Sequence, residues 1–219
     1  MSKAKQNKFE KSMPVYESKC FLVRNLYWNR IKTAIDFAQI RDDFALLDIG
    51  CNRGQLLKSI RNVNKHCELW GTDIEPRITT LKIDDCNFRV CDIKKLPFEN
   101  GYFDIVFVLS TLEHIPDLDS AIKEISRVLK PQGSAILSSP TESWFYRFCR
   151  FLLFGTIEKD VTIAKSEPRS EADHHYHNVY NIEKIFSQNG FKQIKLKYHP
   201  RFPVPVLHRV SKFQKHNNE

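Results

Sequence analysis

The six cysteines of this 219-residue chain show none of the spacings that mark a metal or redox centre. No two of them form a CxxC pair, and none lies at zinc-ligand spacing from a histidine. This pattern favours free, mostly buried thiols in a reducing compartment. We therefore expect neither a disulfide framework nor a bound metal.

Long apolar runs are also missing. Residues 1–15 are rich in lysine and poor in apolar side chains, and no apolar core of a secretory signal follows them. No segment approaches the apolar length that a bilayer-spanning helix needs. We expect a cytoplasmic protein with a disordered basic tail over 1–15, although it could still lie on a membrane surface.

The charge is unbalanced, with 34 Lys and Arg against 26 Asp and Glu, a net charge of +8. Such an excess favours anionic partners, among them nucleic acid, phospholipid headgroups and phosphorylated substrates. Hydrophobic residues make up 42% of the chain, enough for one domain with a sizeable core. We expect that domain over 16–210, followed by a frayed polar tail over 211–219.

Strand-like and helix-like segments alternate along the chain. A helix with one apolar stripe is expected from Ser18 to about Ala38, and a second follows Asp117, a good helix cap. Short apolar, β-prone runs that predict strands lie at 44–49, 67–74, 87–93, 102–110 and 134–139. This order predicts an α/β fold, a doubly wound and mostly parallel sheet with helices on both faces.

Polar and glycine residues gather where the expected strands end, which is where such sheets bind ligands. Gly50 and Gly54 would let the backbone bend sharply before a helix whose free N–H groups face a ligand. A dinucleotide fingerprint is a poor match, because Asn52 and Gln55 occupy its second and third glycine positions.

Four segments in order carry a specific resemblance: "LLDIGCNRGQLL", "GTDIEP", "CDIKKLPFENGYFDIVFVLSTLEHI" and "AIKEISRVLKPQGSAIL". Together they resemble the successive motifs of class I S-adenosylmethionine-dependent methyltransferases of type 11, the UbiE/UbiG-like group. The resemblance implies a Rossmann-like methyltransferase fold of the seven-stranded type. It implies a cofactor-binding core over 44–139 and a substrate-side insertion over 141–178.

The resemblance also assigns roles to residues. Asp48 and Gly50 would line the methionine end of the cofactor, Asp73 would bind the ribose hydroxyls, and Asp92 would read the adenine amino group. The remaining cofactor-binding positions are Cys51, Asn52, Gly54, Ile74, Ile93, Leu109, Ser110 and Thr111. The usual GCGxG is "GCNRG" here, and asparagine tolerates the left-handed backbone that this turn needs.

Three histidines are candidate catalytic residues: His114, His175 and His177. His114 lies in "STLEHIP" after the fourth strand, where a hydrogen-bonded histidine could equally fix the loop. His175 and His177 belong to "DHHYHN" at 173–178, which could ligate a metal but is better explained as a solvated loop. Methyltransferases of this type often place a polar residue from this loop over the site.

The segment "SWFYRFCRFLLFG" at 143–155 suggests the acceptor class. It predicts a core helix, an apolar lid or an interfacial helix whose arginines meet headgroups. We expect a small, amphipathic or lipid-linked acceptor, with peripheral membrane contact through 143–155. One alternative is an RNA or protein methyltransferase, but the dispersed basic residues and the lack of a recognisable RNA-binding module argue against RNA. The other alternative is a non-catalytic module that keeps the fold.

Overall fold

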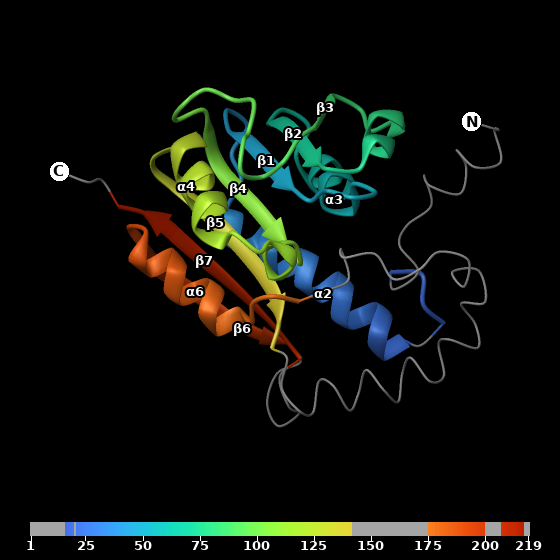
Figure 1. The fold of residues 1–219 in the computed structure, drawn as a ribbon. Coiled ribbons are helices and arrows are strands. Elements are labelled where there is room, and N and C mark those ends of the chain that lie inside the picture. The colour runs from blue at the N-terminus through green and yellow to red at the C-terminus, as the bar shows by residue number, and fades with distance from the viewer. Residues whose placement is uncertain (1–15, 20, 142–174, 200–206, 217–219) are drawn as a thin grey trace.

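The computed structural model describes residues 16–19, 21–141, 175–199 and 207–216, which form one sheet with helices around it (Figure 1). The expectations for 1–15 and 143–155, and most of the 141–178 insertion, lie outside these residues. The strands are β1 Ala45–Ile49, β2 Glu68–Asp73, β3 Cys86–Val90, β4 Phe103–Leu109, β5 Leu129–Pro140, β6 Phe191–His199 and β7 His208–Lys215. The helices are α2 Phe21–Ala38, α3 Gln55–Val63, α4 Leu118–Val128 and α6 Val179–Gln188, with short 3₁₀ helices η1 Pro76–Thr80 and η2 Leu112–His114.

The strand order in space is β3-β2-β1-β4-β5-β7-β6. The first five strands run parallel, whereas β7 is antiparallel to both β5 and β6. All five residues of β1 are buried, as its continuous apolar sequence predicts for a central strand covered on both faces. The predicted doubly wound, mostly parallel sheet is therefore confirmed.

Helices cover both faces of the sheet (Figure 1). On one face α4 and α6 pack on Leu47, Ile49 and Val106, and on the other α2 and α3 pack on Leu46 and Phe107. The carboxylate of Asp117 accepts a hydrogen bond from the backbone N–H of Ser120 and caps α4, as predicted. None of the described helices is long and apolar enough to cross a membrane.

The prediction that 211–219 is a frayed polar tail is wrong for the part of it that the structure describes. Residues 211–215 complete β7, which hydrogen bonds to β5 on one side and to β6 on the other. Phe213 is fully buried beside Phe186 of α6, and Ser211 and Lys212 are buried as well. A strand inside the sheet satisfies its backbone through both neighbours, so polar side chains along it do not prevent folding.

Candidate functional site

The turn after β1 is built on backbone that few residues adopt. Gly50 and Gly54 have φ of +73° and +70°, and Asn52 has φ of +46°. A Cβ at Gly50 would overlap Thr111 Oγ1 and lie 2.8 Å from Thr111 Cγ2. Asn52 therefore adopts the left-handed conformation that its place in "GCNRG" predicted, and Gly50 lets the turn contact the loop after β4.

The turn is tied to the neighbouring strand through Asp73. The Asp73 carboxylate accepts the Asn52 N–H through Oδ2 at 2.9 Å and the Glu75 N–H through Oδ1 at 3.0 Å. Each oxygen keeps further acceptor capacity, since an ionised carboxylate offers about four lone-pair sites. Asp73 thus fixes the turn and still presents acceptors to a ligand.

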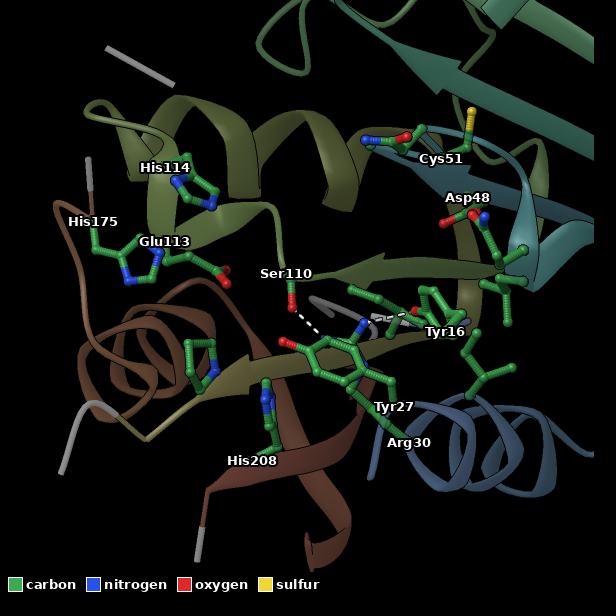
Figure 2. Close-up of a pocket in the computed structure, with 17 residues that line it drawn as sticks. Tyr16, Tyr27, Arg30, Asp48, Cys51, Ser110, Glu113, His114, His175 and His208 are labelled. Carbon is green, nitrogen blue, oxygen red and sulfur yellow. Dashed lines mark hydrogen bonds between the residues drawn. The ribbon is translucent and has the colours of Figure 1, made fainter. Parts of the chain in front are cut away.

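A cavity of about 280 Å³ opens between this turn, the end of β4 and helix α2 (Figure 2). It brings together residues that are far apart in the sequence. Its lining comprises Tyr16, Tyr27, Arg30, Ile31, Asp48, Gly50, Cys51, Asn52, Gln55, Leu56, Leu109, Ser110, Glu113, His114, Pro140, His175 and His208. Eight of the predicted site residues are among them: Asp48, Gly50, Cys51, Asn52, Leu109, Ser110, His114 and His175.

The predicted adenosine half lies beyond the cavity. Asp73, Ile74, Asp92 and Ile93 do not contribute to the described lining. Asp92 is exposed at the end of β3, with Lys94 3.6 Å from its carboxylate, and Ile74 is exposed too, whereas Ile93 is buried in the core. Thr111 lies against Gly50 of the turn and Gly54 lies against Ile83, and neither contributes to the described lining. The ribose and adenine roles stay predictions.

Arg30 of α2 is the main charged group that the sequence pattern missed. Its side chain is 4% exposed, donates to Ser110 Oγ and to the Tyr16 hydroxyl at 3.0 Å, and lies 5.0 Å from the ring centroid of Tyr27. Among the described residues, no acceptor faces its buried Nε and no carboxylate pairs with it. Its position three residues after Tyr27, within the apolar stripe, was the signal that could have revealed it.

Two other lining residues titrate unusually. Burial, reinforced by the charge of Asp73, raises the pKa of Asp48 well above its usual range, although Arg30 opposes the shift. Burial followed by the charges of Asp48 and Asp73 also raises the pKa of Cys51, so this thiol stays protonated and is not a nucleophile at neutral pH.

His208 was not predicted because it reaches the site through the reversed strand. It begins β7, whose antiparallel direction places it opposite Pro140 at the end of β5. Burial, with smaller contributions from Arg30 and His199, lowers its pKa well below its usual value. A neutral imidazole therefore faces the cavity at neutral pH.

The predicted catalytic histidines separate in the structure. His114 and His175 line the cavity with their ring centroids 4.6 Å apart, next to the buried Glu113. His177 does not contribute to the described lining, because its ring is held between the Asn181 side-chain amide at 2.9 Å and the Pro116 carbonyl at 3.2 Å. The geometry supports a site role for His114 and His175, and a structural role for His177.

Comparison with known proteins identifies the domain. Residues 47–137 match the family model described as a methyltransferase domain. A sterol 4-C-methyltransferase of Caenorhabditis elegans is 33% identical over 45% of this chain and 32% of its own length. A ubiquinone/menaquinone biosynthesis C-methyltransferase of Chromobacterium violaceum is 29% identical over 80% of this chain and 77% of its own. The chain spans about half the length, 47%, of the corresponding enzyme of Burkholderia vietnamiensis.

The fold agrees with this comparison. The Haemonchus contortus phosphoethanolamine N-methyltransferase 2, solved in complex with S-adenosyl-L-methionine, superposes with a TM-score of 0.63. The match covers 86% of this chain and 53% of that one at 17% identity, so it bears on the fold alone. The ordered motifs, the strand order and the matched domain model agree. Residues 47–137 of this chain therefore carry a methyltransferase domain.

Proposed function

We propose that this chain transfers the methyl group of S-adenosylmethionine to a small amphipathic acceptor. One observation carries the proposal: a single cavity joins the glycine turn after β1 to an aromatic wall from the N-terminal part of the chain. The turn is the part of this fold that faces the cofactor in the family. The wall and the histidines leave a second surface of the same cavity for another molecule.

The residues present fit the cofactor. The guanidinium of Arg30, which lines the cavity, suits the carboxylate of the methionine end. The absent side chain at Gly50 lets a ligand approach the backbone closely. Asp48 lies beside this turn, and Asp73 at the end of β2 and Asp92 after β3 would bind ribose and adenine. When bound, the cofactor supplies an activated methyl group on a sulfonium.

The protein's own contribution is then mostly positioning. Methyl transfer is an in-line displacement, so the chain must hold the acceptor in line and exclude water. A general base matters only for an acceptor that must lose a proton. The described cavity groups able to accept one include the neutral imidazole of His208, the pair His114 and His175, and the carboxylate of Glu113.

Two observations support an amphipathic acceptor. The C-methyltransferase relatives are named for sterol and for ubiquinone/menaquinone biosynthesis, which involve ring compounds with large apolar parts. The cavity wall itself combines aromatic and aliphatic side chains, namely Tyr16, Tyr27, Ile31, Leu56 and Leu109. RNA or protein as acceptor finds no comparable support. Peripheral membrane contact through 143–155 belongs to this proposal and is tested by deleting that segment.

Calorimetry with S-adenosylhomocysteine tests the cofactor half. The native chain should bind it, and Asp73→Ala should weaken binding roughly 10- to 100-fold, the cost of losing charged hydrogen bonds. Asp84→Ala, an exposed aspartate on the loop before β3, is the matched control. No binding to the native chain would favour a non-catalytic module, and unchanged affinity in Asp73→Ala would refute the ribose assignment.

Transfer of a radiolabelled methyl group tests the acceptor half. A phenolic ring carrying a long isoprenoid tail should be a better substrate than the same ring without the tail, through a lower KM. Deletion of 143–155 should impair use of the tailed acceptor, or liposome binding, more than it impairs cofactor binding. Equal loss of both would identify 143–155 as part of the core.

A further inference from the structure

Three side chains with metal-ligand chemistry converge at one end of the cavity, across from Asp48 (Figure 2). We propose that Glu113, His114 and His175 bind a divalent transition-metal cation, and that an open coordination position takes an oxygen of the acceptor. The second part rests on the proposed function, and the first does not. A carboxylate oxygen of Glu113 and one ring nitrogen from each histidine lie within 4.8 Å of one another.

The fold holds the three residues together although His175 is about sixty residues further along the chain. Glu113 and His114 are consecutive in η2, which follows β4. The backbone N–H groups of Tyr176 and His177 both donate to the Glu113 carbonyl, at 2.8 and 3.4 Å. These bonds fix the position of the 175–178 segment, so His175 reaches the other two ligands from a defined direction.

His177 secures the same arrangement. The Asn181 amide donates to its Nδ1, which makes Nε2 the protonated nitrogen that donates to the Pro116 carbonyl. His177 thus links the start of α6 to the loop after η2, on both sides of the proposed ligands. His177 therefore has a positioning role: it lies outside the cavity, and its hydrogen bonds hold the segment that carries His175 into the cavity.

The environment of Glu113 favours a bound cation. The residue is 1% exposed and its carboxylate accepts a hydrogen bond from Ser139 Oγ at 3.1 Å. Among the described residues, no lysine or arginine forms an ion pair with it. A buried carboxylate is costly without a compensating charge, and a divalent cation between Glu113 and the two imidazoles would provide it.

The ligand set indicates the class of metal. Two imidazoles and one carboxylate match the three protein ligands of catalytic Zn²⁺ sites, which leave a further position open for water or substrate. Imidazole ligands favour Zn²⁺, Cu²⁺, Fe²⁺ or Ni²⁺ over Mg²⁺, Ca²⁺ and Mn²⁺. In such a position the cation would orient an acceptor oxygen toward the cofactor side of the cavity. This departs from the expectation of no metal, which considered cysteines and the 173–178 cluster without Glu113 and His114.

Metal titration of the full, tag-free chain tests the proposal. After treatment with a chelator, the protein is titrated with Zn²⁺ by calorimetry and with Co²⁺ by visible absorption. The native chain should bind one equivalent, with Co²⁺ bands typical of nitrogen and oxygen ligands. His175→Ala should weaken Zn²⁺ binding by more than the roughly 10- to 100-fold that loss of an outer-shell partner costs. His216→Ala, an exposed histidine just after β7, should bind like the native chain.

Glu113→Gln and S-adenosylhomocysteine binding separate the possible explanations. Glu113→Gln should lose Zn²⁺ affinity while its circular dichroism stays native, and His175→Ala should keep its affinity for S-adenosylhomocysteine. The metal proposal is overturned if the native chain binds no Zn²⁺, or if His175→Ala and Glu113→Gln both bind it as tightly as the native chain. Metal binding without S-adenosylhomocysteine binding would refute the proposed function and leave the metal site standing.

Discussion

At the scale of single residues, the site buries ionisable side chains whose charged forms are costly to remove from water. Asp48 is buried at the end of β1, and burial together with Asp73 raises its pKa well above the usual range. The folded chain then binds a proton that the unfolded chain releases above about pH 4. The contribution of Asp48 to stability is therefore lost as pH rises through this range.

Replacing Asp48 by asparagine removes this cost. Asp48→Asn should raise the free energy of unfolding at pH 7 by about 1–3 kcal/mol, the order of a buried unsatisfied polar group. It should also weaken S-adenosylmethionine binding, since the carboxyl group beside the turn is lost. Urea unfolding at pH 7 measures the first effect and calorimetry the second, with the exposed Asp36→Asn as control. A less stable Asp48→Asn chain would contradict this account of the site.

His208 gives the opposite pH dependence. Its pKa is lowered by burial and by Arg30 and His199, so the folded chain excludes a proton that the unfolded chain takes up below about pH 6.5. The contribution of His208 to the free energy of unfolding is therefore present above that pH and is lost as pH falls.

Substitution of His208 should reveal this loss. Between pH 6 and 5, the free energy of unfolding of the native chain should fall more steeply than that of His208→Gln, by up to about 1.4 kcal/mol per pH unit. Denaturant unfolding at several pH values measures the difference. His66→Gln, at an exposed position, should leave the slope unchanged. Parallel profiles for the native chain and His208→Gln would show that His208 is protonated in the folded state.

At the scale of elements, the turn between β1 and α3 depends on its contact with the loop after β4. Gly50→Ala should destabilise the chain by more than about 1 kcal/mol, because of its φ of +73° and the overlap with Thr111. Adding Thr111→Ala to the Gly50→Ala chain should restore the stability lost to the overlap with Thr111. The stability lost to backbone strain at position 50 should remain lost. Thermal unfolding of the two single variants and the double variant measures the coupling. Strict additivity would mean that the overlap does not determine the cost.

The end of the chain shows where sequence reasoning failed at this scale. The polar letters "SKFQKHNNE" at 211–219 suggested a frayed end, yet residues 211–215 belong to β7, which pairs on both sides. Arg209 forms an ion pair of 2.6 Å with Glu183 of α6, so a charge that reads as solvated in the sequence is nearly buried here. The partner lies on another element, and no local pattern could reveal it.

Phe213 measures how much β7 contributes to the fold. Phe213→Ala should lower the free energy of unfolding by about 3–5 kcal/mol, the usual cost of deleting a fully buried phenylalanine. His216→Ala, one exposed residue beyond β7, should change it by less than about 0.5 kcal/mol. Equal, small effects in denaturant titrations would restore the expectation of a frayed end.

At the scale of the whole molecule, the sequence predicted what depends on local pattern. The apolar runs predicted five strands and their parallel direction. The glycines and Asn52, which suits a left-handed backbone, predicted the turn. The pattern could not place Arg30 beside the loop after β4, because Arg30 reaches Ser110 across eighty positions of sequence. His208 was missed for the same reason, since only the reversal of β7 brings it to the carboxyl ends of the other strands.

The arrangement of the molecule therefore assigns two jobs to one cavity. Under the proposed function, the turn after β1 and Arg30 of α2 would hold the cofactor, whereas η2 and β7 would face the acceptor. Figure 1 shows where these elements lie. His114 of η2 lies within the motif segments that carry the family resemblance, whereas His175 and His208 lie outside them. Substrate choice in this chain should accordingly follow changes in η2, β7 and the 175–178 segment rather than changes in the turn.

A crystal structure with bound S-adenosylhomocysteine tests the central claim most directly. We predict its homocysteine end between Arg30, Asp48 and Gly50, its ribose on Asp73 and its adenine beside Asp92, with the Glu113 end of the cavity left for the acceptor. Density for the ligand elsewhere, or a cavity filled by the chain's own side chains under saturating ligand, would contradict the account.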